Sequence, residues 1–163
     1  MAADYFLKIN GIPGESVKDK HKDEIELHSW SWSQTNSGSH AANTGGGQGR
    51  VDMEDFEFQM TTNKASTELF LHCANGKHIP DAILACRQQG GKQQEYLKIK
   101  FTDLVVSSFK LGGSNDDKTT VKPMETIKFN FAKIEFSYSQ QDKDGSQKPW
   151  ATKWYNVKET TFG

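Results

Sequence analysis

The stretch that decides the fold spans residues 125–138 and reads ETIKFNFAKIEFSY. Large apolar side chains occupy odd positions up to Phe131 and even positions from Ile134 onward, so the parity switches near Ala132-Lys133. Alternation with a period of two is typical of a strand that buries one face. A long strand whose parity switches needs a bulge or a bend, which favours a curved sheet or a barrel.

The same period-two pattern recurs elsewhere in the chain. Apolar and polar residues alternate in the segments 5–9, 25–32, 56–60 and 97–101. Within 25–32 the parity switches between Leu27 and Trp30, which predicts a second bulge near His28-Ser29. The pattern over 81–88 is ambiguous, but the turn residues Gln89-Gly90-Gly91 after it favour a strand. We therefore predict a mainly β fold, an antiparallel β-barrel.

One segment departs from the period of two and predicts a short helix. Ser66 suits the N-cap, and Glu68 in the first turn complements the helix dipole. Three apolar residues fall on one face: Leu69, Phe70 and Cys73. Asn75-Gly76 then supplies a left-handed stop. Since such a helix is too short to be stable alone, we expect it to pack on the sheet, across the open end of the barrel.

A long uncharged segment interrupts the strands between Ser33 and Arg50. It reads SQTNSGSHAANTGGGQGR and carries no charge before Arg50. Loops longer than about 12–15 residues are uncommon inside compact domains and are usually functional or disordered. We therefore predict an extended loop whose backbone groups are available to another chain.

Length and composition fit one domain over residues 1–163 with a polar surface. The chain has 163 residues, a net charge of -1 and an apolar fraction of 34%, and its mean hydropathy is -0.74. Charges of both signs are interleaved, as in the run 18–24, so we expect a solvated turn there and no nucleic-acid partner. Cys73 and Cys86 are not spaced as metal ligands and are interpreted as buried free thiols, with a disulfide as the minor alternative.

The start of the chain has neither a basic segment nor an apolar segment of the kind that a secretory signal contains. No apolar run approaches the ~20 residues that a membrane helix needs. We therefore expect synthesis in the cytoplasm, no signal peptide and no membrane insertion.

Catalytic and cofactor motifs are not completed anywhere in the sequence. The glycines before Arg50 lack the Lys and the following helix of a phosphate-binding loop. The five histidines show no metal-ligand spacing, Ser37-Gly38-Ser39 lacks the context of a nucleophile elbow, and Asp116-Asp117 lacks the spacing of a calcium loop. We predict a protein that is not an enzyme and that has no catalytic residue, cofactor or metal.

Trp30 and Trp32 share one side of their predicted strand, and Ser31 takes the other side. Trp normally packs in the core. Ser31 therefore faces away from the core, toward solvent or a second binding surface.

These elements in this order resemble the Hcp (haemolysin-coregulated protein) family along nearly the whole chain. The strongest stretches are 4–16, 24–27 leading to Trp30-Ser31-Trp32, 64–69 with 73–78, 96–108 and 125–138. The chain departs from the family pattern at Asn63 and Thr67, where the family usually has Asp and Pro, which could alter the entry to the helix.

The resemblance implies a β-barrel with one short helix that assembles into a hexameric ring. Rings stack into the inner tube of a type VI secretion machine, which lies inside a contractile sheath, carries a VgrG spike and is expelled with effectors in its lumen. The protein is then made in the bacterial cytoplasm and found outside the cell. We expect Ser31 to line the lumen and face the cargo. The expected ring-contact residues are Gln34, Asn36, Ser37, Ser39, His40, Asn43, Gly45, Gly46, Gly47, Gln48 and Arg50.

Two other classes of function stay open at this point. A small-ligand-binding barrel of the lipocalin type predicts a closed apolar cavity and a monomer. A hydrolase would use Ser37 or Ser39 with His40, although nothing in the sequence orients the base.

Overall fold

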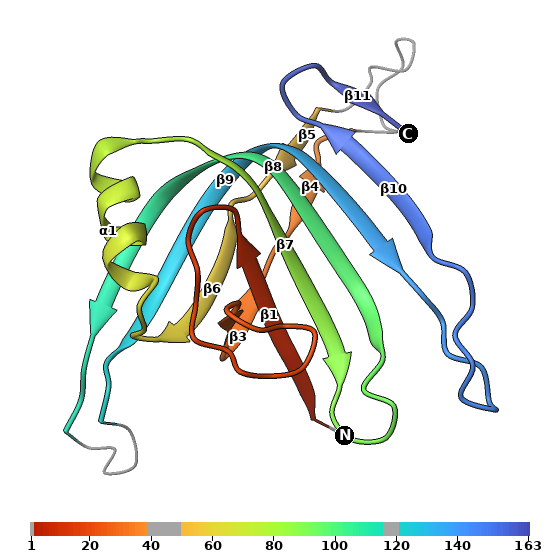
Figure 1. Ribbon diagram of the computed structural model, residues 1–163. Coiled ribbons are helices and arrows are strands. Elements are labelled where there is room, and N and C mark those ends of the chain that lie inside the picture. Colours follow the sequence, from red (N-terminus) through yellow and green to blue (C-terminus); the bar gives the residue numbers. More distant parts are fainter. Residues whose placement is uncertain (1, 39–49, 116–120) are drawn as a thin grey trace, which may run out of the picture.

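A computed structural model describes residues 2–38, 50–115 and 121–163, and confirms the mainly β, antiparallel fold (Figure 1). The helix α1 (Ser66–Asn75) lies between the sixth and seventh strands of the chain. The strands are β1 (Ala3–Ile9), β2 (Ile25–Glu26), β3 (Ser29–Ser31), β4 (Gln34–Asn36), β5 (Val51–Met53), β6 (Phe56–Thr61), β7 (Ile79–Gln88), β8 (Glu95–Gly112), β9 (Met124–Tyr138), β10 (Ala151–Asn156) and β11 (Thr161–Phe162).

A circuit of antiparallel pairings closes the barrel. β1 pairs with β7, β7 with β8, β8 with β9, and β9 with β6. The chain between β2 and β3 completes the circuit, because β2 pairs with β1 and β3 pairs with β6. Residues 27 and 28 lie where the chain passes from β1 to β6. The Leu27 amide donates to the Tyr5 carbonyl on β1 at 2.9 Å, and the His28 amide donates to the Gln59 carbonyl on β6 at 2.8 Å.

Both parity switches lie where the chain changes its neighbouring strand. At residues 27–28 the chain leaves β1 as a neighbour and joins β6. In β9, residues 124–129 pair with β6 and residues 133–138 pair with β10. The register shifts of the described sheet lie elsewhere, in β7 between Cys86 and Arg87 and in β8 between Val106 and Ser108.

Aromatic side chains fill the centre of the barrel. The Phe56 ring lies 4.8 Å from that of Phe101 and 5.0 Å from that of Phe129, and all three side chains are buried. Burial of one such side chain contributes roughly 2–3 kcal/mol. The alternation of apolar residues in β6, β8 and β9 therefore supplies a continuous core.

The start of α1 differs from the prediction. The N-cap residue is Ala65, which makes no side-chain cap hydrogen bond, and Ser66 is the first residue inside the helix. The Ser66 hydroxyl instead donates to Glu125 Oε2 at 2.6 Å, and Asn63 Oδ1 accepts from the Ala65 amide at 2.8 Å. A carboxylate from β9 therefore engages the hydroxyl that local sequence assigns to the cap.

The end of α1 and its packing follow the prediction in part. Gly76 is left-handed at φ 68° and its amide donates to the His72 carbonyl. Leu69 enters the core and Cys73 packs against it, but Phe70 is 57% exposed and does not share their face. Figure 1 shows α1 beside the end of β8, at one side of the barrel. Within the described residues, no helix is long and apolar enough to cross a membrane.

Candidate assembly and cargo surfaces

Ser31 lies on the outer side of the barrel, opposite the two tryptophans that flank it. Trp30 is half-buried and its ring lies 6.1 Å from both Tyr5 and Phe56. Trp32 is also half-buried, and its Nε1 donates to the Glu54 carbonyl at 3.0 Å. Because both tryptophans pack toward the core, the β alternation places Ser31 in solvent.

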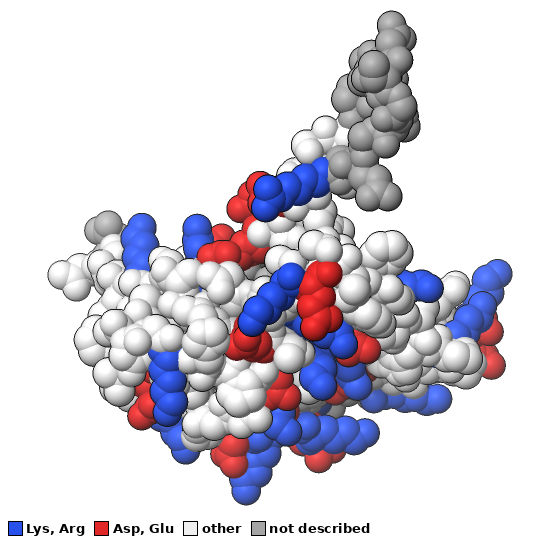
Figure 2. Space-filling model, turned by 90° about the horizontal axis from the view of Figure 1, so that it is seen from above, with Lys and Arg blue, Asp and Glu red and all other residues white. Residues whose placement is uncertain are grey.

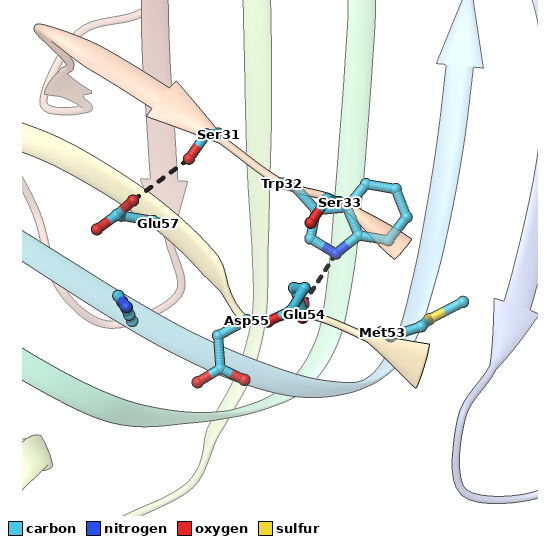
Figure 3. A pocket seen from close by; sticks show the side chains of 8 residues that line it. Ser31, Trp32, Ser33, Met53, Glu54, Asp55 and Glu57 are labelled. Carbon is cyan, nitrogen blue, oxygen red and sulfur yellow. Dashed lines mark hydrogen bonds between the residues drawn. The ribbon is translucent and has the colours of Figure 1, made fainter. Parts of the chain in front are cut away.

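The outer surface around Ser31 is polar and hollowed (Figure 3). The Ser31 hydroxyl donates to Glu57 Oε2 at 3.4 Å, and the Ser107 hydroxyl donates to the Asp55 carboxylate beside it. The depression is lined by Ser31, Trp32, Ser33, Met53, Glu54, Asp55, Glu57 and Lys128. Small hydroxyls and charges of both signs suit weak polar contacts that form and break readily, and they differ from the apolar lining of a typical small-molecule pocket.

A two-stranded ribbon continues the β3–β6 pairing past the wall of the barrel. β4 pairs with β5, with Gln34 opposite Met53 and Asn36 opposite Val51. All three β4 residues are exposed. The ribbon shows that the predicted loop from Ser33 to Arg50 is wrong over its first part, because Gln34–Asn36 form a strand.

Ser37 and Arg50 hold the outer end of the described ribbon together. The Ser37 amide donates to the Arg50 carbonyl at 3.1 Å, and the Arg50 amide donates to the Ser37 hydroxyl at 3.2 Å. Of the predicted contact residues, Gln34, Asn36, Ser37 and Arg50 thus lie on this ribbon. The other seven lie outside the described residues: Ser39, His40, Asn43, Gly45, Gly46, Gly47 and Gln48.

A groove separates the ribbon from the C-terminal strands. Its ribbon side includes Arg50, Val51 and Met53, and its other side includes Val157 and Phe162. Phe162 is 77% exposed. The ribbon and the C-terminal strands therefore present backbone and apolar groups together on one side of the molecule.

The described residues hold no group of three or more His, Cys, Asp or Glu side chains arranged for a metal ion. Both cysteines are free thiols. Burial raises the pKa of the Cys86 thiol to about 12, against an opposing hydrogen bond with the Trp30 side chain, so Cys86 stays protonated at neutral pH.

Sequence reasoning missed a buried histidine that lies between two carboxylates in the charged run 18–24. His21 is 5% exposed and stacks on Phe6 at a centroid distance of 4.2 Å. Its Nδ1 lies 2.9 Å from Glu24 Oε2, and its Nε2 lies 2.7 Å from Glu95 Oε1. The run is therefore not a simple solvated turn, although its alternating signs gave no hint of burial.

Asp4, on β1, makes charged contacts with the same segment. Burial works to raise the pKa of its carboxyl, but hydrogen bonds from Gln89 and Lys18 and the positive charges of Lys18 and Arg87 outweigh burial and lower it. Asp4 Oδ1 accepts a hydrogen bond from Gln89 Nε2 at 2.6 Å and another from Lys18 Nζ at 3.3 Å. These contacts hold the segment before β2 against β1 and β7.

Comparison with known proteins gives a family match over most of the chain. Residues 6–138 match the family described as "Type VI secretion system effector, Hcp". The chain is 37% identical over 162 residues to Protein hcp1 of Pseudomonas aeruginosa, covering 98% of each chain.

Solved structures agree with this match. Hcp1 from Salmonella typhimurium is 38% identical, with a TM-score of 0.78 and 99% of each chain covered. A structure described as a type six secretion system protein has a TM-score of 0.91 at 26% identity, covering 99% of this chain and 100% of the other. A type VI secretion system effector from Yersinia pestis is 31% identical, with a TM-score of 0.75, covering 94% of this chain and 100% of the other.

Proposed function

The chain belongs to the Hcp family of type VI secretion proteins, and on that premise we propose that it is a structural subunit of the secretion tube. Six copies form a ring, and rings stack into an inner tube. The tube lies inside a contractile sheath, carries a VgrG spike at its tip and is expelled with effectors in its lumen. The protein is made in the cytoplasm and leaves the cell with the tube.

The observation that carries this proposal is the ribbon of β4 and β5. A two-stranded ribbon is marginally stable by itself, and here one strand is exposed along its whole length. A strand of another chain can add to the exposed edge of such a ribbon through backbone hydrogen bonds. The β4–β5 ribbon therefore suits a subunit that assembles with other copies.

Electron microscopy of the purified protein tests the proposal. We expect rings with an open centre, and stacked rings at higher concentration. A monodisperse monomer at high concentration would contradict ring formation.

Deletion of Gly45–Gly49 tests the contribution of the segment beyond the ribbon. We expect ring stacking or neighbour contact to weaken while the circular dichroism spectrum and the unfolding midpoint stay close to those of the intact chain. The single substitution Lys22→Gln, at an exposed position in another segment, is a control that should assemble normally. Normal assembly of the deletion variant would exclude this segment from the contacts.

Ser31 is the residue that we propose to line the lumen. Ser31→Gln places a longer side chain in the depression beside Glu57, and we expect lower levels of a co-expressed effector with rings unaffected. Lys22→Gln again serves as the control. Unchanged effector levels with Ser31→Gln would count against a cargo role for this face.

A further inference from the structure

Three neighbouring strands reverse the face that they bury at the same level of the sheet. In β8, Phe101 and Leu104 are both fully buried although they are three positions apart. A regular strand would turn these two side chains to opposite faces, because its side chains alternate. The strands on either side show the same pattern, with two buried residues three positions apart: Ile79 and Ala82 in β7, and Phe131 and Ile134 in β9.

Cross-strand pairing aligns these reversals into one line across the sheet. The buried residues lie opposite one another in two rows, Ile79–Leu104–Phe131 and Ala82–Phe101–Ile134. Between the rows, both ladders pair Thr102 and Leu104 but skip Asp103. We call the line between the two rows the crease, and it passes through Pro80, Asp103 and Ala132.

Asp103 produces the reversal in β8 through its backbone. Its φ is +56°, in the left-handed region. The other described non-glycine residues with positive φ lie outside the strands: Lys20, Asp23, Gln93 and Thr160. Left-handed backbone is unfavourable for a residue with a side chain, although Asp tolerates it better than most. Asp103 therefore holds backbone strain, and this conformation lets both parts of β8 bury their apolar residues.

Contacts from outside the ladders hold the crease. His78 precedes β7, and its Nδ1 lies 2.6 Å from Asp103 Oδ1. On β9, the Ala132 carbonyl accepts from the Val157 amide at 2.7 Å. Pro80 has no amide hydrogen to donate to a ladder. The backbone along the crease is therefore held less by strand pairing than the backbone on either side.

The crease divides the sheet into two leaves. The first leaf comprises β6, residues 104–112 of β8 and residues 124–131 of β9. The second leaf comprises residues 81–88 of β7, 95–102 of β8, 133–138 of β9 and β10. Figure 1 shows β8 and β9 arching from the end beside α1 to the side that carries β10.

We infer that the crease is a hinge between the two leaves, and that the His78–Asp103 contact is a clasp that fixes its angle. Hinges in proteins are a few residues that absorb changes in φ and ψ while the elements on either side stay intact. The inference concerns the shape of a single chain. It goes beyond the proposed function, because it does not depend on the formation of rings.

The position of the clasp allows it to open. The side chains of His78 and Asp103 are 67% and 43% exposed, so their contact can break without uncovering the core. Seen from above, acidic and basic side chains lie together on this face of the molecule (Figure 2), as expected of a surface in water. The second leaf also has freedom to move, since Phe136 and Tyr138 on its inner side are exposed. Opening of the clasp removes the contact that offsets the strain at Asp103, and the second leaf then changes its angle.

The distance between two spin labels tests the hinge in the full chain. Cys73→Ser removes the partly exposed native thiol, and Cys86 stays buried. Lys110→Cys and Lys153→Cys then place one label on each leaf, both at exposed positions. The labelled chain is diluted with an excess of unlabelled Cys73→Ser chain, so that the measured distance lies within one chain.

Removal of the clasp should change the distance between the labels. We expect a narrow distribution with His78 present, and a shifted or clearly broader one after His78→Ala. His28→Ala, which removes another exposed histidine, is the matched control and should leave the distribution unchanged. Identical distributions with and without His78 would overturn the inference, as would an equal change in the control. Either result leaves the tube proposal standing, and a failure to see rings in the microscope leaves the hinge standing.

Substitutions at Asp103 separate its backbone from its side chain. Asp103→Gly removes the clasp but adopts the left-handed conformation without steric cost, so the distance distribution should broaden as it does for His78→Ala. Asp103→Ala removes the clasp and also strains the backbone, so its unfolding equilibrium constant should be about 5-fold or more above that of Asp103→Gly. Urea unfolding measures this ratio. Equal stability of the two variants, or an unchanged distribution for Asp103→Gly, would contradict the inference.

Discussion

The two halves of β9 have the same alternation of apolar residues but opposite exposure. In the first half, Ile127 and Phe129 are 0% and 1% exposed, whereas in the second half Phe136 and Tyr138 are 44% and 46% exposed. The difference follows from the neighbouring strand, since β6 closes the barrel over the first half and β10 continues the sheet away from it. We refer to these as the closed half and the open half.

This comparison shows what an exposed aromatic residue means in this fold. A side chain that faces the inner side of the sheet in the closed half stabilises the subunit. The same kind of side chain in the open half adds little to the subunit and remains available to a partner. Stability and assembly should therefore respond to different residues of one strand.

Substitution of one aromatic residue in each half gives the largest expected contrast. Phe129→Ala removes a fully buried ring and should lower the free energy of unfolding by about 3–5 kcal/mol. Phe136→Ala should lower it by less than about 1 kcal/mol, because its ring is half exposed. Urea unfolding should be measured at a concentration where sedimentation shows a monomer. Equal losses for the two variants would break the distinction between the halves.

Glu125 tests how the closed half holds the helix. Its carboxylate is 1% exposed and accepts from the Ser66 hydroxyl at 2.6 Å. Glu125→Ala leaves that buried hydroxyl without its acceptor and should lower the free energy of unfolding by about 1–3 kcal/mol. Glu125→Gln keeps an acceptor oxygen and should lower it less.

A double-mutant cycle serves as the control for this contact. Ser66→Ala combined with Glu125→Ala should lose less than the sum of the two single variants, because both partners of one hydrogen bond are then gone. Additive losses in urea unfolding would mean that Ser66 and Glu125 do not stabilise the fold together.

The sequence predicts the strands well because alternation is a local property. The strands around Phe58, Ile99 and Phe129 each show it, and the structure confirms all three. The partner of a strand is not local. The alternation therefore locates both parity switches, at residues 27–30 and 132–133, but not the exchange of neighbouring strands that occurs at each of them.

The same limit explains the other differences. Ser66 resembles a helix cap in local sequence, yet its hydroxyl bonds to Glu125 from a distant strand. The strand Gln34–Asn36 has no apolar residue and is exposed throughout, so only its pairing with β5 defines it. His21 is buried against Glu95, which lies far along the chain. The position of Ser31 on the outer side could be predicted, because it depends only on its two neighbours.

Asp4, which lies on β1, provides a pH-dependent test of the contacts that hold the segment before β2. Its pKa is lower in the folded chain than its ordinary value, so it contributes stability above its unfolded pKa, and that contribution is lost as pH falls through the folded pKa. Asp4→Asn should therefore lower the free energy of unfolding at neutral pH by about 1 kcal/mol, and the difference should vanish in strong acid. Glu15→Gln, at an exposed position, is the control. A difference that is constant with pH would show that the charge of Asp4 is not responsible.

Thiol labelling tests the comparison with the smallest effect on stability. It measures how fast one buried cysteine becomes accessible to a reagent. Cys86 is 1% exposed, and burial raises its pKa to about 12, so at neutral pH iodoacetamide should modify the partly exposed Cys73 and leave Cys86 intact until the chain unfolds. In the Cys73→Ser background, the labelling rate of Cys86 then reports opening of the sheet around β7, where Cys86 pairs with Leu97 of β8. Phe129→Ala should raise that rate strongly, whereas Phe136→Ala should leave it near the wild-type rate. Equal acceleration by both substitutions would mean that the two halves open together, and that the aromatic residues of the open half are part of the subunit's own core.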